Sequence, residues 1–193
     1  MGYLKGLKEY IKAEYAKSVF DQAVASQIPY EIHMHGFRII KARVIENLVF
    51  DIRADIEGQG EEILSKIQIK FLYPADQSET VRPLIKIDKK VKALGLEAIL
   101  DFRVRYYVKN KTLYPLMKDR EVLFFTLLEG DVLRGLVTDF TRFDLTLSFK
   151  GGILVTLLRH AIYDLRNKQG DCLLRRVQEE KRDWEKSSLY VTE

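Results

Sequence analysis

The hydrophobic and polar positions of the chain alternate most regularly between residues 122 and 165. From Phe143 to Phe149 every second residue is apolar, which is typical of a strand with one face in a core. Val122 to Leu128 is apolar except for Thr126, so we expect a strand that is covered on both faces. Turns that contain glycine lie between the apolar segments. The pattern predicts five short strands in close succession, over residues 122–128, 132–139, 143–149, 153–158 and 161–165.

Gly135 interrupts the second of these strands. Five strands joined by minimal turns suit a small, strongly bent barrel of the SH3-like type. Such a barrel needs a residue without a Cβ where a strand folds over on itself, and Gly135 meets that need. The alternative interpretation is a weak position in an ordinary meander.

Three motifs in this stretch resemble the Sm fold in its bacterial Hfq form. They are Gly130-x-x-Leu133-x-Gly135-x-Val137, Phe140-x-x-Phe143-x-Leu145 and Arg159-His160-Ala161-Ile162. Leu158 and Thr141 depart from that family, in which an aromatic residue and an Asp often stand at these positions. The resemblance implies a five-stranded open barrel and an RNA-binding face at the junction between neighbouring subunits.

Arg142, Phe143, Arg159 and His160 are the candidate RNA-binding residues. The resemblance makes Phe143 the residue that stacks on a base, Arg142 the polar residue before it, and Arg159-His160 the basic pair. Stacking of a base on an aromatic ring contributes ~1–3 kcal/mol, and arginine and histidine contact phosphates, 2′-hydroxyls and base edges. Each residue also has a structural interpretation: Phe143 as a core residue, His160 as a cap on backbone groups between strands, and Arg142 as a solvated side chain.

The same pattern occurs 93 residues earlier in the chain. Residues 50–56 have the form of residues 143–149, and a single register without gaps aligns about forty residues. Ala42 falls on Gly135, so a small residue is matched by a small residue. Ile67 falls on His160. We therefore expect a tandem repeat in which the first copy keeps the scaffold and lacks most of the site.

The predicted fold class is mainly β (α+β), with two small five-stranded Sm-like barrels, an N-terminal helix and a C-terminal helical tail. An amphipathic helix is predicted from Leu4 to Val24, and an edge strand from Phe102 to Val108. We expect four segments. Residues 1–74 form the helix and the degenerate barrel, and residues 75–112 form a basic linker with a short helix at 89–99. Residues 113–166 form the Sm/Hfq-like barrel, led by a short helix at 113–119, and residues 167–193 form a charged tail that is helical to about Lys186 and then frayed.

Composition places the chain among globular proteins. Of its 193 residues, 47% are hydrophobic and 31% are charged. Cys172 is the single cysteine, which excludes an intrachain disulfide and favours a reducing compartment. The N-terminal residues do not form a signal peptide, and no apolar stretch is long enough to span a membrane, so a cytoplasmic location is expected.

The net charge of +4 is unevenly distributed along the chain. Between residues 82 and 120 there are eleven Lys and Arg against four Asp and Glu. A local basic segment of this kind is what a polyanionic partner needs, although a solvated connector has the same composition.

The chain offers no persuasive catalytic set. It contains no phosphate-binding loop, nucleophile elbow or paired-cysteine motif, so we expect a non-enzymatic protein without a cofactor. His33 and His35 share one face of a predicted strand and could hold a metal, but no third ligand is evident. A metal-dependent enzyme is therefore the weakest of the hypotheses.

The first hypothesis is a protein that binds single-stranded RNA, rich in uridine or adenine, on the second barrel. The second is an interaction scaffold that has kept the Sm fold without RNA binding. Strand edges or terminal helices predict a homo-oligomer. Sm and Hfq proteins pair the fourth strand of one subunit with the fifth strand of the next, and a tandem chain could form one such junction internally. Three chains would then complete a ring, whereas helices that cover the edges would limit the assembly to a dimer.

Overall fold

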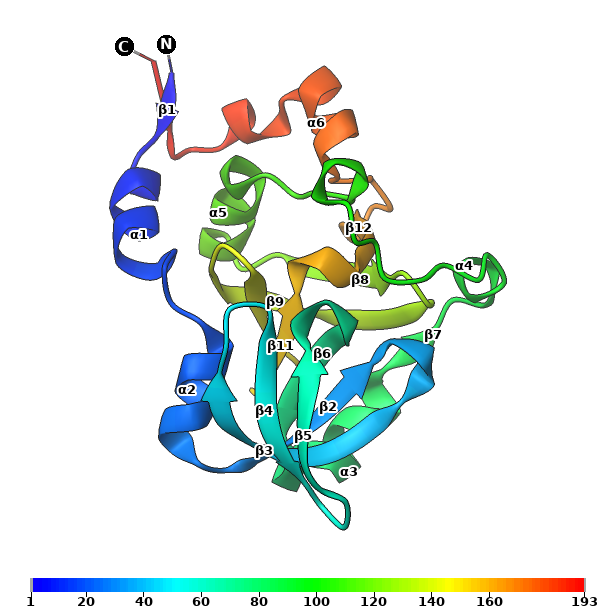
Figure 1. Cartoon of the computed structure of the whole chain (residues 1–193). Coiled ribbons are helices and arrows are strands. Elements are labelled where there is room, and N and C mark those ends of the chain that lie inside the picture. Colours follow the sequence, from blue (N-terminus) through cyan, green and yellow to red (C-terminus); the bar gives the residue numbers. More distant parts are fainter. Residues whose placement is uncertain (1, 193) are drawn as a thin grey trace.

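A computed structural model describes residues 2–192 of the chain (Figure 1). Eleven of its strands form one continuous antiparallel sheet. Met1, Glu193 and the side chains of residues 177–179 lie outside the described part of the chain. The strands are β2 (Pro29–Met34), β3 (Ile39–Asn47), β4 (Asp51–Ile56), β5 (Gly60–Ser65), β6 (Ile69–Pro74), β7 (Lys86–Ile87), β8 (Val122–Leu127), β9 (Asp131–Phe140), β10 (Asp144–Ser148), β11 (Leu154–Leu158) and β12 (Ile162–Arg166). The chain is thus mostly β with a few helices, as the sequence predicts.

The sheet consists of two sets of five strands with the same internal order. Its strands follow the order β12-β8-β9-β10-β11-β6-β2-β3-β4-β5, and the short β7 pairs with β9. Each set places its fifth strand beside its first and its fourth strand at the opposite end. β2 and β8 begin and end 93 residues apart, and so do the 3₁₀ turns Lys66–Gln68 and Arg159–Ala161. The displacement predicted from the sequence therefore reappears in the secondary structure.

The two sets meet where β11 pairs with β6. Thr156 lies opposite Leu72, and Leu157 lies opposite Phe71. This pairing joins the fourth strand of the second set to the fifth strand of the first. Among the described strands, neither set pairs its own fourth strand with its own fifth, so β5 and β12 are the outer edges of the sheet.

A close backbone approach explains the glycine in β9. A Cβ on Gly135 would lie 2.9 Å from the carbonyl oxygen of Ser148 and 3.2 Å from the ring of Phe149. A side chain at this position would therefore force β9 away from β10. This confirms the prediction that the strand needs a residue without a Cβ here.

The predicted N-terminal helix is two helices. α1 (Leu7–Glu14) and α2 (Val19–Ser26) are separated by an extended residue, Ser18, whose hydroxyl accepts a hydrogen bond from the backbone N–H of Phe20. This is a typical N-cap, and it starts a new helix. The break allows α1 to pack on the core of the second set while α2 packs on the core of the first.

The linker differs from its prediction. Residues 102–108 form no strand, because the segment folds on itself: Arg103 pairs with Asp101, and Arg105 donates to the carbonyl groups of Ile99 and Leu100. The only regular structure in this segment is a 3₁₀ turn at Phe102–Val104. The linker also contains α3 (Ser78–Val81) and α4 (Lys89–Lys92). α5 (Asn110–Lys118) follows and covers the core of the second set, with Pro115 inside it.

The C-terminal tail is also more ordered than predicted. α6 (Arg175–Lys181) and a 3₁₀ turn at Asp183–Lys186 are followed by β13 (Tyr190–Val191). β13 pairs with β1 (Tyr3–Leu4), so the two ends of the chain lie side by side (Figure 1). The prediction of a frayed end is wrong up to residue 192. None of the described helices is long and apolar enough to cross a membrane.

Candidate functional site

A hollow of about 970 Å³ lies where the β9–β10 loop meets the corner after β11. The linker, the start of the tail and Tyr15, which follows α1, form its remaining walls. Its cationic residues come from these four segments and are Arg103, Arg105, Arg142, Arg159, Arg175 and Arg176. Its aromatic residues are Tyr15, Phe102, Tyr106, Tyr107 and Phe143. None of the described residues that line the hollow is acidic, so its local potential favours an anion.

The loop and the corner are held together by the backbone. The N–H of Arg159 donates to the carbonyl oxygen of Phe143 over 2.8 Å. Within the loop, the hydroxyl of Thr141 donates to the carboxylate of Asp144 over 2.8 Å and fixes the turn between them. Both of these residues are buried. The turn therefore presents Arg142 and Phe143 outward, and the four predicted site residues all line the same hollow.

Phe143 and Arg142 form the accessible part of the site. Phe143 is 60% exposed, which excludes the alternative that it is a core residue. The guanidinium of Arg142 lies 5.4 Å from the centre of the Phe143 ring, within the range of a cation–π contact. An exposed ring can stack on a planar base, and an exposed cation beside it can contact the adjoining phosphate.

Arg159 lies at the buried end of the hollow and is 8% exposed. Its Nη1 donates to the side-chain oxygen of Asn110, at the start of α5, over 3.0 Å. Its guanidinium also lies over the ring of Phe140 at 5.4 Å. Burial lowers the pKa of Arg159, but an arginine keeps its charge at neutral pH. The site therefore contains a desolvated positive charge.

His160 takes part in the contact between the two sets of strands. Its Nε2 lies 2.9 Å from the carbonyl oxygen of Ile69 in β6, and since a carbonyl only accepts, this nitrogen carries the proton. Burial lowers the pKa of His160 to about 4, so the ring is neutral at neutral pH. The interpretation of His160 as a backbone cap is the one that its geometry matches. Direct contact of its ring with RNA stays a prediction.

The sequence did not single out the residues that the linker and the tail contribute to the hollow. Tyr106 packs edge-on against Tyr163 of β12, with ring centres 5.0 Å apart, and the N–H of Arg175 donates to the carbonyl of Tyr107 over 2.8 Å. These contacts bring two distant segments to the same wall. For the linker, a signal was available in the excess of positive charge between residues 82 and 120, but this segment does not include the tail residues.

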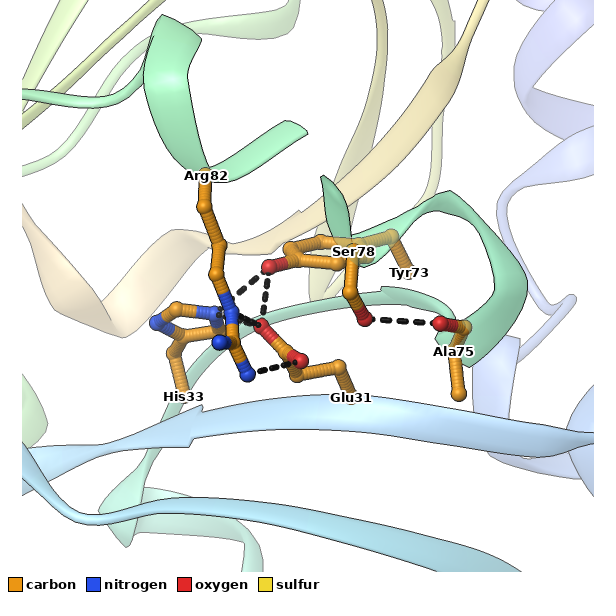
Figure 2. Close-up of polar contacts among 6 residues, drawn as sticks. All are labelled: Glu31, His33, Tyr73, Ala75, Ser78 and Arg82. Carbon is orange, nitrogen blue, oxygen red and sulfur yellow. Dashed lines mark hydrogen bonds and ion pairs between the residues drawn. The ribbon is translucent and has the colours of Figure 1, made fainter. Parts of the chain in front are cut away.

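A second polar cluster surrounds Glu31 on β2 (Figure 2). Arg82 binds the carboxylate with two parallel hydrogen bonds of 2.8 and 2.6 Å, and the hydroxyl of Tyr73 donates to the same group. Burial alone would raise the pKa of Glu31, but these hydrogen bonds outweigh it and lower the pKa to about 2. The carboxylate is fully occupied by its partners, so the cluster stabilises the fold and offers no free base.

The two histidines proposed as metal ligands have other surroundings. His33 belongs to the Glu31 cluster, with its Nε2 2.9 Å from the hydroxyl of Tyr73. His35 lies with its Nδ1 3.8 Å from the carboxylate of Glu129. Within the described residues, no group of three or more His, Cys, Asp or Glu side chains is arranged to hold a metal ion.

Comparison of the chain with family models, with curated proteins and with solved structures finds no match to any of them. The geometry of the hollow is therefore the basis on which we infer a function.

Proposed function

We propose that this chain is a non-enzymatic protein of the Sm/Hfq-like class that binds single-stranded RNA in the hollow beside Phe143. The observation that supports it most is the composition of the hollow: six arginines and five aromatic residues, without an acidic residue among those that line it. Proteins that bind single strands combine cations that follow the phosphates with aromatic rings on which bases stack.

The strand order supports the class. Each set of five strands places its fifth strand beside its first, and the two sets are joined through a fourth and a fifth strand. This is the pairing by which Sm and Hfq subunits assemble, so we interpret each set as a small open barrel. The hollow then lies beside the internal junction, which His160 crosses to reach Ile69.

Replacing Phe143 with alanine is expected to weaken binding of a short uridine- or adenine-rich RNA by about tenfold or more, because one stacking platform is lost. Arg142→Ala is expected to have a smaller effect in the same direction, since it removes one phosphate contact. Affinity is measured by fluorescence polarisation at several salt concentrations, and it should fall as salt rises.

Arg134 provides a matched control for the loss of charge. Arg134 is exposed, and its guanidinium lies 5.5 Å from the centre of the Phe124 ring. The two residues form a cation–π pair like that of Arg142 and Phe143, but they lie outside the hollow. Arg134→Ala should leave the affinity within about twofold of wild type. Equal losses for Arg134→Ala and Arg142→Ala would indicate diffuse attraction to the whole surface. Unchanged affinity in Phe143→Ala would remove the proposal.

The unpaired edge of β5 favours a second function, assembly through strand pairing. Ile63 of β5 corresponds by the repeat to Thr156 of β11, which lies opposite Leu72. Ile63 is 63% exposed and pairs with Arg53 of β4 on one side, but no described strand lies on its other side. The other outer strand, β12, is already flanked by the tail, since the N–H of Leu173 donates to the carbonyl of Leu165. We therefore propose a dimer in which β5 pairs with β5 of a second copy.

Ile63→Lys is expected to raise the dissociation constant of this dimer by about tenfold, because a lysine on a strand edge opposes pairing. Light scattering over a range of concentrations measures the mass. Val49→Lys is the control, since Val49 is also exposed but lies in the loop between β3 and β4. A monomeric wild-type protein at all concentrations would contradict the dimer.

A further inference from the structure

Arg159 has one side of its guanidinium without a partner. Nη1 is held by Asn110, but Nε and Nη2 are buried and make no hydrogen bond within the described residues. These two N–H groups point in parallel along the same edge of the guanidinium, and together they form a fork that fits two oxygens of one anion. A buried charged donor without an acceptor is costly, so it requires an explanation in a native structure.

Two other arginines of this chain show what such an edge binds. Arg82 donates from Nε and Nη2 to the two oxygens of Glu31. Arg103 uses the same two nitrogens for the carboxylate of Asp101. Arg159 has the same edge free of partners, and it is one of the residues that line the hollow, none of which is acidic among those described. Asp144 is near enough for its charge to act on Arg159, but it makes no hydrogen bond to the free edge. An oxyanion from outside the chain would fit this edge.

The depth of Arg159 selects the kind of oxyanion. Phe143 stands exposed at the rim of the hollow, whereas Arg159 is buried at its inner end. An internal phosphodiester carries one negative charge and is attached to RNA on both sides, so both flanking segments of the strand would have to bend into the hollow. A terminal phosphomonoester has a single attachment and up to two negative charges. It can enter end-on while the adjoining base remains near Phe143.

We propose that Arg159 binds the phosphomonoester at an end of a single-stranded RNA, and that the hollow discriminates phosphorylated ends from hydroxyl ends. This inference rests on the proposed function, because it assigns the end of the RNA to the same site. The nitrogens of Arg159 are buried from solvent, so a rim side chain must shift to admit the phosphate. Phe102 lines the hollow from its 3₁₀ turn and is 76% exposed, so we expect its ring to be the side chain that shifts.

The test compares oligouridines of one length that carry a 5′-phosphate, a 3′-phosphate or hydroxyls at both ends, with uridine monophosphate as a further ligand. For wild-type protein we expect one phosphorylated end to raise the affinity about tenfold over the hydroxyl-ended RNA. Arg159→Lys keeps the charge but lacks the fork, so the ratio should fall to about one. Arg142→Ala should weaken all the RNAs and leave the ratio unchanged.

The outcomes separate this inference from the function on which it rests. RNA binding with equal affinity for all ends would overturn the role of Arg159 and leave the RNA-binding proposal standing. No binding of any RNA would overturn both. Tight binding of uridine monophosphate without a gain from the attached RNA would identify a mononucleotide site and contradict end recognition. A shift of the Arg159 Nε–H resonance on addition of the phosphorylated RNA tests the contact in wild-type protein, in case Arg159→Lys does not fold.

Discussion

Replacing Lys70 with methionine is expected to lower the free energy of unfolding by about 3–5 kcal/mol, because it leaves two buried carboxylates without their cation. Lys70 lies on β6 and is 2% exposed. Its ammonium group contacts Glu129 over 2.6 Å and Asp131 over 2.7 Å. Glu129 lies in the turn between β8 and β9, and Asp131 is the first residue of β9, so these ion pairs join the two sets of strands.

The carboxylates have few other partners that could replace Lys70. The remaining oxygen of Glu129 accepts the backbone N–H of Gly36 over 2.7 Å, and the ring of His35 lies nearby. Burial lowers the pKa of His35, so its ring does not supply a compensating charge at neutral pH. Loss of the lysine is therefore expected to destabilise the interface between the two sets of strands.

Urea unfolding followed by circular dichroism measures this effect. Arg53→Met is the matched control, because Arg53 pairs with Glu46 over 2.9 Å at the surface and its loss should cost at most about 1 kcal/mol. The triple variant Lys70→Met, Glu129→Gln, Asp131→Asn removes all the charges together and should recover much of the stability. A loss below about 1 kcal/mol in Lys70→Met would contradict the role given to this ion pair.

Acidification is expected to destabilise the protein through His160, by about 2 kcal/mol between pH 7.5 and pH 5 and by about 3 kcal/mol near pH 4. The pKa of His160 is about 4 in the folded protein, because the ring is buried, against 6.5 for an ordinary histidine. The unfolded chain therefore takes up the proton first as the pH falls. The contribution of neutral His160 to the stability is fully present above about pH 6.5 and is lost as the pH falls toward 4.

His160→Gln tests this prediction, since glutamine can donate to the carbonyl of Ile69 but does not titrate in this range. We expect the variant to be less dependent on pH between 7.5 and 4 than the wild type, as measured by urea unfolding at each pH. Burial also lowers the pKa values of His33 and His35, so part of the dependence should persist in the variant. Identical pH profiles for the two proteins would show that His160 is not the responsible group.

The alternation of apolar residues was sufficient to predict the strands and their repetition. A strand places every second side chain in the core, so its period is visible without knowledge of its neighbours. The strands of residues 122–166 and the displacement of 93 residues both follow from this local rule. Gly135 was predictable for a related reason, because a missing side chain inside an alternating strand indicates a close backbone approach.

Tertiary contacts decided the points at which the prediction was wrong. The periodicity from Leu4 to Val24 does not show that two separate cores must be covered, and Ser18 divides the helix between them. The alternation from Phe102 to Val108 resembles a strand, but the arginines find partners within the linker itself. In each case the pattern is compatible with two structures, and the available partners select one.

The sequence by itself determined the repeated strands, because alternation depends on neighbours along the chain, but it left Phe143 open between a core residue and a stacking residue. Only the tertiary structure decided that Arg159 is a buried cation with a free edge and that His160 spans the junction. It also placed the arginines of the linker and tail beside them. Burial and pairing depend on segments far apart in sequence, and it is desolvation by those segments that gives these charged groups their properties.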